Sequence, residues 1–166
     1  MFVIRTARKE DASQIVAIDA RCFDAAEAAA PEFVARSMEG YHGHYWVIVD
    51  TDAHDKVVTY LNGYCSNNKD LVDEEMEHPE TAHREDGAWQ ILCGLATLPE
   101  YQGRGLAEMI LRHGIEVARK EGRKGVVLTC KDHLVPYYAK HFGFVNEGPS
   151  ASTHCGVEWN QMRLTF

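Results

Sequence analysis

Apolar positions along the chain follow two spacings, one typical of strands and one typical of helices. Apolar runs predict strands around Val3–Ile4, over 45–49, 57–61, 89–97 and 126–130, from Phe144 onward, and over 157–164. Apolar residues three and four positions apart predict helices after Glu10–Asp11 and over 31–38, 105–121 and 135–141. Because strands alternate with helices, we expect an α/β fold with a mixed central sheet flanked by helices.

Three segments add detail to this pattern. The run from Trp89 to Thr97 is almost wholly apolar, which is typical of a central strand covered on both faces. Residues 50–55 are polar and predict the turn of a hairpin. The segment 67–87 is acidic and long for a plain loop, so we expect a binding loop or lid there. Within it, Asp70 is suited to cap a short helix that begins at Leu71.

Length and charge limit the class of protein. The 166 residues contain no linker or repeat, so we expect a single domain over residues 1–166. No stretch approaches the roughly 18 apolar residues of a membrane helix, and Arg5 interrupts any signal-peptide core. We therefore expect a soluble, cytoplasmic protein. The net charge of −8 disfavours nucleic acid and anionic membranes as partners and favours a cationic substrate.

The five cysteines are odd in number, widely spaced and without a CxxC pair. This spacing argues against a disulfide framework and against a structural zinc site. Several of them stand in apolar runs, where a cysteine is usually a small core residue in a reducing compartment. They are Cys22, Cys65, Cys93, Cys130 and Cys155.

The segment with the clearest chemical meaning is Leu98-Pro-Glu-Tyr-Gln-Gly-Arg-Gly-Leu-Ala-Glu-Met, between a predicted strand and a predicted helix. Gly103 and Gly105 allow a tight turn and the close approach of a ligand. The amides from Gly103 to Ala107 are then suited to bind an anion at the helix N-terminus. A Walker loop is excluded because no GxxxxGK[ST] run exists, and Glu108 stands where a dinucleotide fingerprint needs a third glycine or alanine.

Gln102-Gly-Arg-Gly-Leu-Ala resembles the Q/R-x-x-G-x-G/A acetyl-CoA signature of the GNAT superfamily of N-acetyltransferases, and Lys140–Phe144 resembles that family's late helix-to-strand junction. The segment from Cys130 to Tyr138 resembles the serotonin (arylalkylamine) N-acetyltransferase branch. The resemblance implies a V-shaped split in the sheet that holds acetyl-CoA, with the acetyl carbonyl and pantetheine on the amides of Cys93 and Leu95. The residues it implies for acetyl-CoA are Cys93, Leu95, Thr97, Gln102, Gly103, Arg104, Gly105, Leu106 and Ala107.

Acetyl transfer to an amine needs a base for the ammonium, donors for the oxyanion and an acid for the thiolate. Tyr138 matches the family's tyrosine acid, although it could instead be a packed aromatic, and Tyr137 beside it is the competing hydroxyl. A thiol nucleophile at Cys93 is disfavoured, because direct transfer needs no covalent intermediate and a buried cysteine is usually inert.

The base stays open at the level of sequence. The paired histidines of vertebrate relatives are replaced here by Trp89 and Ile91, so their mechanism does not carry over. Glu27, His83 and Glu85 are the candidates, each with a solvated surface group as its alternative, and a water chain that ends in backbone carbonyls is a further alternative. The resemblance implies that Phe23 stacks against the substrate, with an anchor for the first helix as the alternative. Trp89 either lines the substrate slot or packs in the core. His42 and His44 are interpreted as part of a surface loop, since this chemistry needs no metal.

The sequence thus favours an enzyme that acetylates a small primary amine, either an arylalkylamine or a polyamine-like molecule, by direct transfer from acetyl-CoA. The aromatic slot favours the first substrate and the acidic segment favours the second. The alternatives are acetylation of a protein N-terminus or lysine, and a catalytically silent acyl-CoA-binding module. The quaternary state is left as monomer or homodimer.

Overall fold

A computed structural model of the chain describes residues 1–152 and 158–166. Seven strands form one mixed sheet in the order β1-β2-β3-β4-β5-β7-β6, and this confirms the predicted α/β class. The strands are β1 (Phe2–Thr6), β2 (Tyr45–Asp50), β3 (Lys56–Ser66), β4 (Trp89–Thr97), β5 (Gly125–Cys130), β6 (Val145–Pro149) and β7 (Asn160–Thr165). The helices are α1 (Ala12–Cys22), α2 (Pro31–Tyr41), α3 (Asp73–Glu77), α4 (Pro79–Ala82), α5 (Leu106–Lys120) and α6 (Val135–Phe142).

The contacts divide the chain into two compact units, which are described separately. One unit comprises residues 1–62 and 94–114, and the other comprises residues 63–93 and 115–166. Because β3, β4 and α5 contribute residues to both units, this division does not test the single-domain prediction for 1–166, which stays a prediction. No helix in the described part of the chain is long and apolar enough to cross a membrane.

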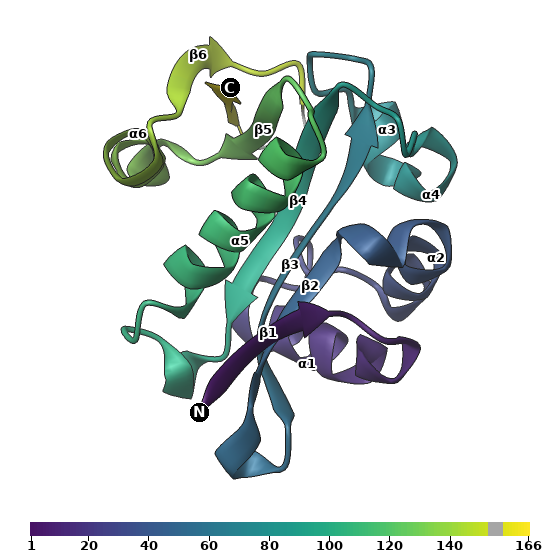
Figure 1. Ribbon diagram of the computed structural model, residues 1–166, viewed down its shortest axis with the longest axis vertical. Coiled ribbons are helices and arrows are strands. Elements are labelled where there is room, and N and C mark those ends of the chain that lie inside the picture. Colours follow the sequence, from purple (N-terminus) through teal and green to yellow (C-terminus); the bar gives the residue numbers. More distant parts are fainter. Residues whose placement is uncertain (153–157) are drawn as a thin grey trace. The chain divides into compact units, whose positions relative to one another are not determined.

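In the first unit, β1, β2 and β3 pair in an antiparallel arrangement (Figure 1), and the predicted turn 50–55 joins β2 to β3. Neighbouring residues on β2 face opposite sides, as in any strand. Tyr45 stacks on Tyr41 of α2, whereas the ring of Trp46 meets His113 of α5. Helices α2 and α5 therefore cover opposite faces of these strands. Gly114 allows the close contact of α5, since a Cβ there would lie 2.8 Å from Leu61 of β3.

In the second unit, β4 and β5 pair in parallel from Trp89–Gly125 to Leu92–Leu128, and this ladder ends before β4 itself ends at Thr97. β5, β7 and β6 continue the sheet with antiparallel pairing (Figure 1). Buried Gln90 on β4 donates through Nε2 to the carbonyls of Tyr64 and Ile91. The Gln90 side chain thus ties the start of β4 to β3.

The structure corrects several boundaries. β3 is longer than predicted, and α2 runs on to Tyr41 because its apolar face continues past Met38. The predicted helix from Leu71 begins later, at Asp73, and Val72 rather than Asp70 stands at its N-cap. Asp70 is used elsewhere, since it accepts hydrogen bonds from Gln161 and Arg163.

The burial of individual residues also differs from prediction in two places. His44 does not lie in a surface loop, because its side chain is buried with its ring edge against Trp46. The prediction of full burial for β4 is wrong in the middle of the strand, where Cys93 is exposed. Cys65 and Cys130 are buried free thiols, as predicted. Cys155 lies outside the described residues.

Candidate active site

The turn between β4 and α5 is fixed at its base by a hydrogen bond from a side chain. The Gln102 side chain donates to the carbonyl of Thr97 across 3.1 Å, which closes the turn at its base. Gly103 and Gly105 have φ values of +79° and +76°, and a Cβ on either would meet no atom within 4 Å. Both glycines are therefore required by the left-handed backbone and not by crowding.

This backbone leads directly into α5, the longest helix, whose first residues are Leu106 and Ala107. The first amides of a helix have no partner inside the helix and carry the positive end of its dipole. The guanidinium of Arg104 lies over the Tyr101 ring, 4.9 Å from its centroid, and donates to the carbonyl of Glu100. The turn thus combines unpaired amides with a fixed cation, which is a chemical environment suited to a phosphate group.

Three consecutive residues in the middle of β4 are accessible to solvent. Cys93 is exposed, while Gly94 and Leu95 are half-buried, although the residues before and after them are buried. Surrounding groups nevertheless desolvate the Cys93 thiolate and raise the pKa of the thiol to about 12. The thiol therefore stays protonated near neutral pH, which disfavours a nucleophilic role as the sequence argument did, although the predicted burial of Cys93 is wrong.

Tyr138 lies on α6 among aromatic neighbours. Its ring makes edge contacts with Tyr137 and Phe144, and the side chain is buried. Burial raises the pKa of its hydroxyl well above the ordinary value, with further contributions from Cys130 and Tyr137. Among the described residues its hydroxyl has no hydrogen-bond partner. Tyr138 is thus a protonated donor that is held in place by its ring and not by its oxygen.

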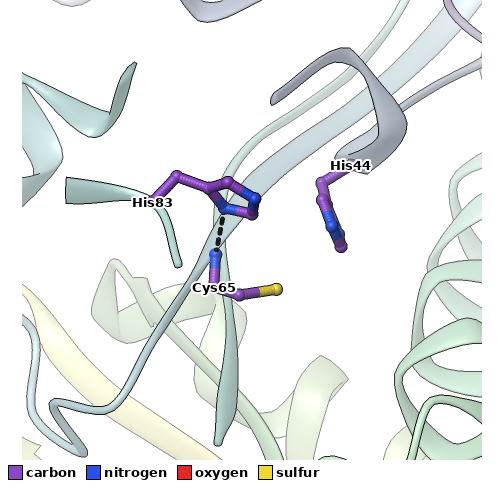
Figure 2. Close-up of side chains that lie close together, drawn as sticks. All are labelled: His44, Cys65 and His83. Atoms are coloured by element: carbon purple, nitrogen blue, oxygen red, sulfur yellow. Dashed lines mark hydrogen bonds between the residues drawn. The ribbon is translucent and has the colours of Figure 1, made fainter. Parts of the chain in front are cut away.

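His83, one of the candidate bases, has both ring nitrogens in hydrogen bonds. Figure 2 shows the Cys65 amide, which donates to Nδ1 of His83 across 3.0 Å. Nε2 lies 2.8 Å from a carboxylate oxygen of Glu85. Because Nδ1 accepts, Nε2 carries the proton and donates to Glu85. This arrangement fixes the ring to β3 and leaves no lone pair for a substrate, so it does not favour a base role for His83.

The remaining predicted residues lie in different places. Phe23 and Glu27 lie half-buried in the segment that follows α1, within the same unit as Thr97 and the turn. Trp89 lies in the other unit, with the Arg163 guanidinium over its ring at 4.7 Å. Its ring also lies 2.8 Å from the position of a Cβ on Gly125, so the ring packs against β5. Its substrate role stays a prediction.

The predicted residues are divided between the two units. Leu95, Thr97 and Gln102–Ala107 belong to one unit, together with Phe23 and Glu27. Cys93, His83, Trp89 and Tyr138 belong to the other.

One pair of polar residues near β4 was missed by the sequence argument. Asp19 of α1 is buried, and the hydroxyl of buried Tyr60 on β3 donates to it through a short hydrogen bond. A signal was present, because Asp19 follows Ile15 by four positions and so lies on the apolar face of the helix, one position after Ile18. A carboxylate at a core position is uncommon and points to a specific partner.

Comparisons with known proteins identify the family. A model described as the acetyltransferase (GNAT) family matches residues 12–144. The loading GNATL domain of CurA from Lyngbya majuscula is 15% identical, with a TM-score of 0.82 over 99% of this chain and 98% of that one. A GNAT family acetyltransferase from Brucella melitensis, in complex with acetyl-CoA, is 18% identical, with a TM-score of 0.62 over 100% and 88% of the two chains.

The ribosomal-protein-S18-alanine N-acetyltransferase from Escherichia coli is also 18% identical, with a TM-score of 0.68 over 99% of this chain and 94% of that one. At such identities these likenesses show the fold. No curated protein sequence is significantly similar to the chain.

Proposed function

The chain belongs to the acetyltransferase (GNAT) family, and from that premise we propose that it transfers the acetyl group of acetyl-CoA directly to a primary amine of a small molecule. We place it in the serotonin (arylalkylamine) N-acetyltransferase-like branch, on the likeness of the segment from Cys130 to Tyr138. Residues 1–166 act as one catalytic domain in this proposal.

The observation that carries the proposal is the turn before α5. Two left-handed glycines, Gly103 and Gly105, direct successive amides outward at the start of a long helix. The pyrophosphate of acetyl-CoA is an anion of the size that such a turn binds. Arg104 adds a positive charge beside it. Gln102 contributes indirectly in this proposal, because its hydrogen bond to the Thr97 carbonyl fixes the base of the turn.

The accessible residues in the middle of β4, Cys93 to Leu95, meet the next requirement in this proposal. The amides of Cys93 and Leu95 hydrogen-bond the acetyl carbonyl and the pantetheine, and so stabilise the oxyanion that forms when the amine attacks. Fixed amide donors suit this role because they need no reorganisation during the reaction.

Tyr138 donates a proton to the sulfur as the carbon–sulfur bond breaks. Its raised pKa keeps the hydroxyl protonated at neutral pH, and the hydroxyl hydrogen can rotate about the C–O bond toward the sulfur. A general acid in such a position typically contributes about 10²–10⁴-fold to the rate.

Among amines, the structure supports an arylalkylamine more than a polyamine. Two of the carboxylates in the acidic segment are used inside the protein. Glu75 accepts hydrogen bonds from Tyr64 and Ser66, and Asp70 accepts from the side chain of Arg163. Fewer acidic groups are therefore available to hold a polycation. Half-buried Phe23 offers an aromatic face in the unit that contains the turn.

The test is the substitution Tyr138→Phe, with Tyr137→Phe as the matched control. We expect Tyr138→Phe to lower kcat by about 10²-fold or more while leaving acetyl-CoA affinity within about twofold. Tyr137→Phe removes a half-buried hydroxyl from the same helix and should preserve turnover. Equal loss of turnover and affinity in Tyr138→Phe, or loss of neither, would refute the acid role of Tyr138.

A further inference from the structure

Asp19 on α1 is a buried carboxylate whose hydrogen-bond partners are neutral. Its side chain accepts the hydroxyl proton of Tyr60 and the backbone N–H of Ala29, the latter across 2.9 Å. Only 4% of the residue is exposed. Within the described part of the chain, no Lys, Arg or His forms an ion pair with this carboxylate.

A buried carboxylate without a cation is energetically costly, because burial removes water from the charge and nothing positive replaces it. Burial accordingly raises the pKa of Asp19, although the bonds from Tyr60 and Ala29 partly oppose the shift. Asp11 shows the usual arrangement of a buried carboxylate, because it forms an ion pair with the guanidinium of Arg5. Asp19 therefore has an unusual affinity for a proton or for a cationic ligand.

The pair lies directly beside the accessible part of β4. A Cβ on Gly94 would lie 3.0 Å from the Tyr60 hydroxyl oxygen, so that oxygen contacts the strand where glycine leaves room. The thiol of Cys22, at the end of α1, donates to the carbonyl of Thr97 across 3.2 Å and ties the same helix to β4. Gly94 stands between Cys93 and Leu95, the residues whose amides are proposed to hold the acetyl carbonyl.

We propose that Tyr60 and Asp19 form the proton acceptor for the amine, with Tyr60 as the catalytic residue that contacts the ammonium and Asp19 as the residue that receives the proton. This inference rests on the proposed acetyl transfer to an amine. It gives the reaction a further candidate base, because both ring nitrogens of His83 are in hydrogen bonds, whereas the roles of Glu27 and Glu85 stay predictions.

The protons balance as follows. The ammonium N–H gives its proton to the Tyr60 oxygen as the Tyr60 hydroxyl proton passes to Asp19, so a neutral amine and a neutral carboxylic acid result. The amine nitrogen then bonds to the acetyl carbon, and the carbon–sulfur bond breaks. As the amide forms, the nitrogen loses its second proton to water, and Tyr138, which has given its proton to sulfur, takes one proton back from water. Asp19 finally releases its proton to water, so amide, thiol and one proton are the products.

Two amine substrates of nearly equal shape distinguish a proton-acceptor role of Tyr60 and Asp19 from a purely structural role. One is the alkylamine that the chain acetylates best, and the other is its β,β-difluoro analogue, whose ammonium is much more acidic. Near neutral pH the first amine must be deprotonated on the enzyme, because alkylammonium pKa values are near roughly 10. A substantial part of the second amine is already neutral in solution.

The test compares Asp19→Asn and Tyr60→Phe with the wild type on both amines. We expect kcat/KM for the ordinary amine to fall by about 10²-fold or more, and for the difluoro amine by about tenfold or less. Acetyl-CoA affinity should stay within about twofold. Tyr64→Phe is the matched control, because it removes another buried β3 hydroxyl bonded to a carboxylate, Glu75. It should affect both amines equally.

A decrease in kcat/KM by the same factor for both amines would overturn the proposal, and so would unchanged activity in both variants. If Asp19→Asn does not fold, Tyr60→Phe alone decides, since it preserves the ring and leaves Ala29 bonded to Asp19. A wild-type protein that releases no thiol with any amine would instead refute the proposed function, and this inference would fail with it.

Discussion

Gly105→Ala tests the acetyl-CoA turn, and Gly122→Ala is its matched control. The two glycines flank the two ends of α5, with the same φ of +76° and no atom within 4 Å of a built Cβ. Alanine in this left-handed region costs roughly 1–2 kcal/mol, and no steric term adds to it at either site. For a chain of this length, each kcal/mol lowers the melting temperature by about 2–4 °C.

Both variants should therefore melt about 2–8 °C below the wild type. Their affinities for acetyl-CoA should differ, because only Gly105 sets the direction of amides that bind the pyrophosphate. A hydrogen bond to a charged group contributes about 1.5–3 kcal/mol, so loss of one such bond lowers affinity by about 10- to 150-fold. Gly122→Ala should leave affinity within about twofold.

Isothermal titration of acetyl-CoA into each folded variant measures this difference, and differential scanning calorimetry confirms the matched stability loss. Gly105→Ala binding acetyl-CoA as tightly as Gly122→Ala does would refute the placement of the pyrophosphate at the turn. A much larger melting decrease for Gly105→Ala than for Gly122→Ala would show that the matched-strain argument is wrong.

Two further substitutions test the fold that positions the site. Gly63→Ala should lower the free energy of unfolding in urea by about 3 kcal/mol or more, because the new Cβ would lie 1.8 Å from the Ile91 carbonyl oxygen. Gly43→Ala is the control, since a Cβ there meets no atom within 4 Å and should change stability little. Burial opposes ionisation of Asp11, but the hydrogen bonds from Arg5 outweigh burial and lower the pKa of the carboxyl group. The stability that ionised Asp11 contributes to the fold is therefore present above about pH 4 and is lost as pH falls through the folded pKa. Asp11→Asn should cost about 1–3 kcal/mol at neutral pH, and a gap to the wild type that does not shrink in acid would contradict this assignment.

Local features of the site could be predicted from sequence. The bounds of β4 were predicted correctly, because its residues are almost wholly apolar and Pro99 follows closely after its end. The turn at Gly103 and Gly105 was also predicted, since glycine pairs before a helix indicate left-handed backbone. In both cases the determining residues are neighbours along the chain.

Features that depend on distant partners could not be predicted. An apolar run does not reveal what covers it, so the exposure of Cys93 in the middle of β4 has no signal in sequence. Asp19 and Tyr60 meet across 41 positions, and Cys65 and His83 across 18. His83 therefore resembled a surface base, although a backbone amide of β3 occupies its free nitrogen.

The most direct test of acetyl transfer is a free-thiol release assay with acetyl-CoA and a panel of amines. The panel comprises tryptamine, phenethylamine, spermidine and a lysine peptide, with acetyl-CoA affinity measured in parallel on the same protein. We expect acetyl-CoA-dependent thiol release with the two arylalkylamines, and slower release with spermidine and the peptide. Tight acetyl-CoA binding without thiol release for any amine would contradict acetyl transfer and indicate an acyl-CoA-binding module.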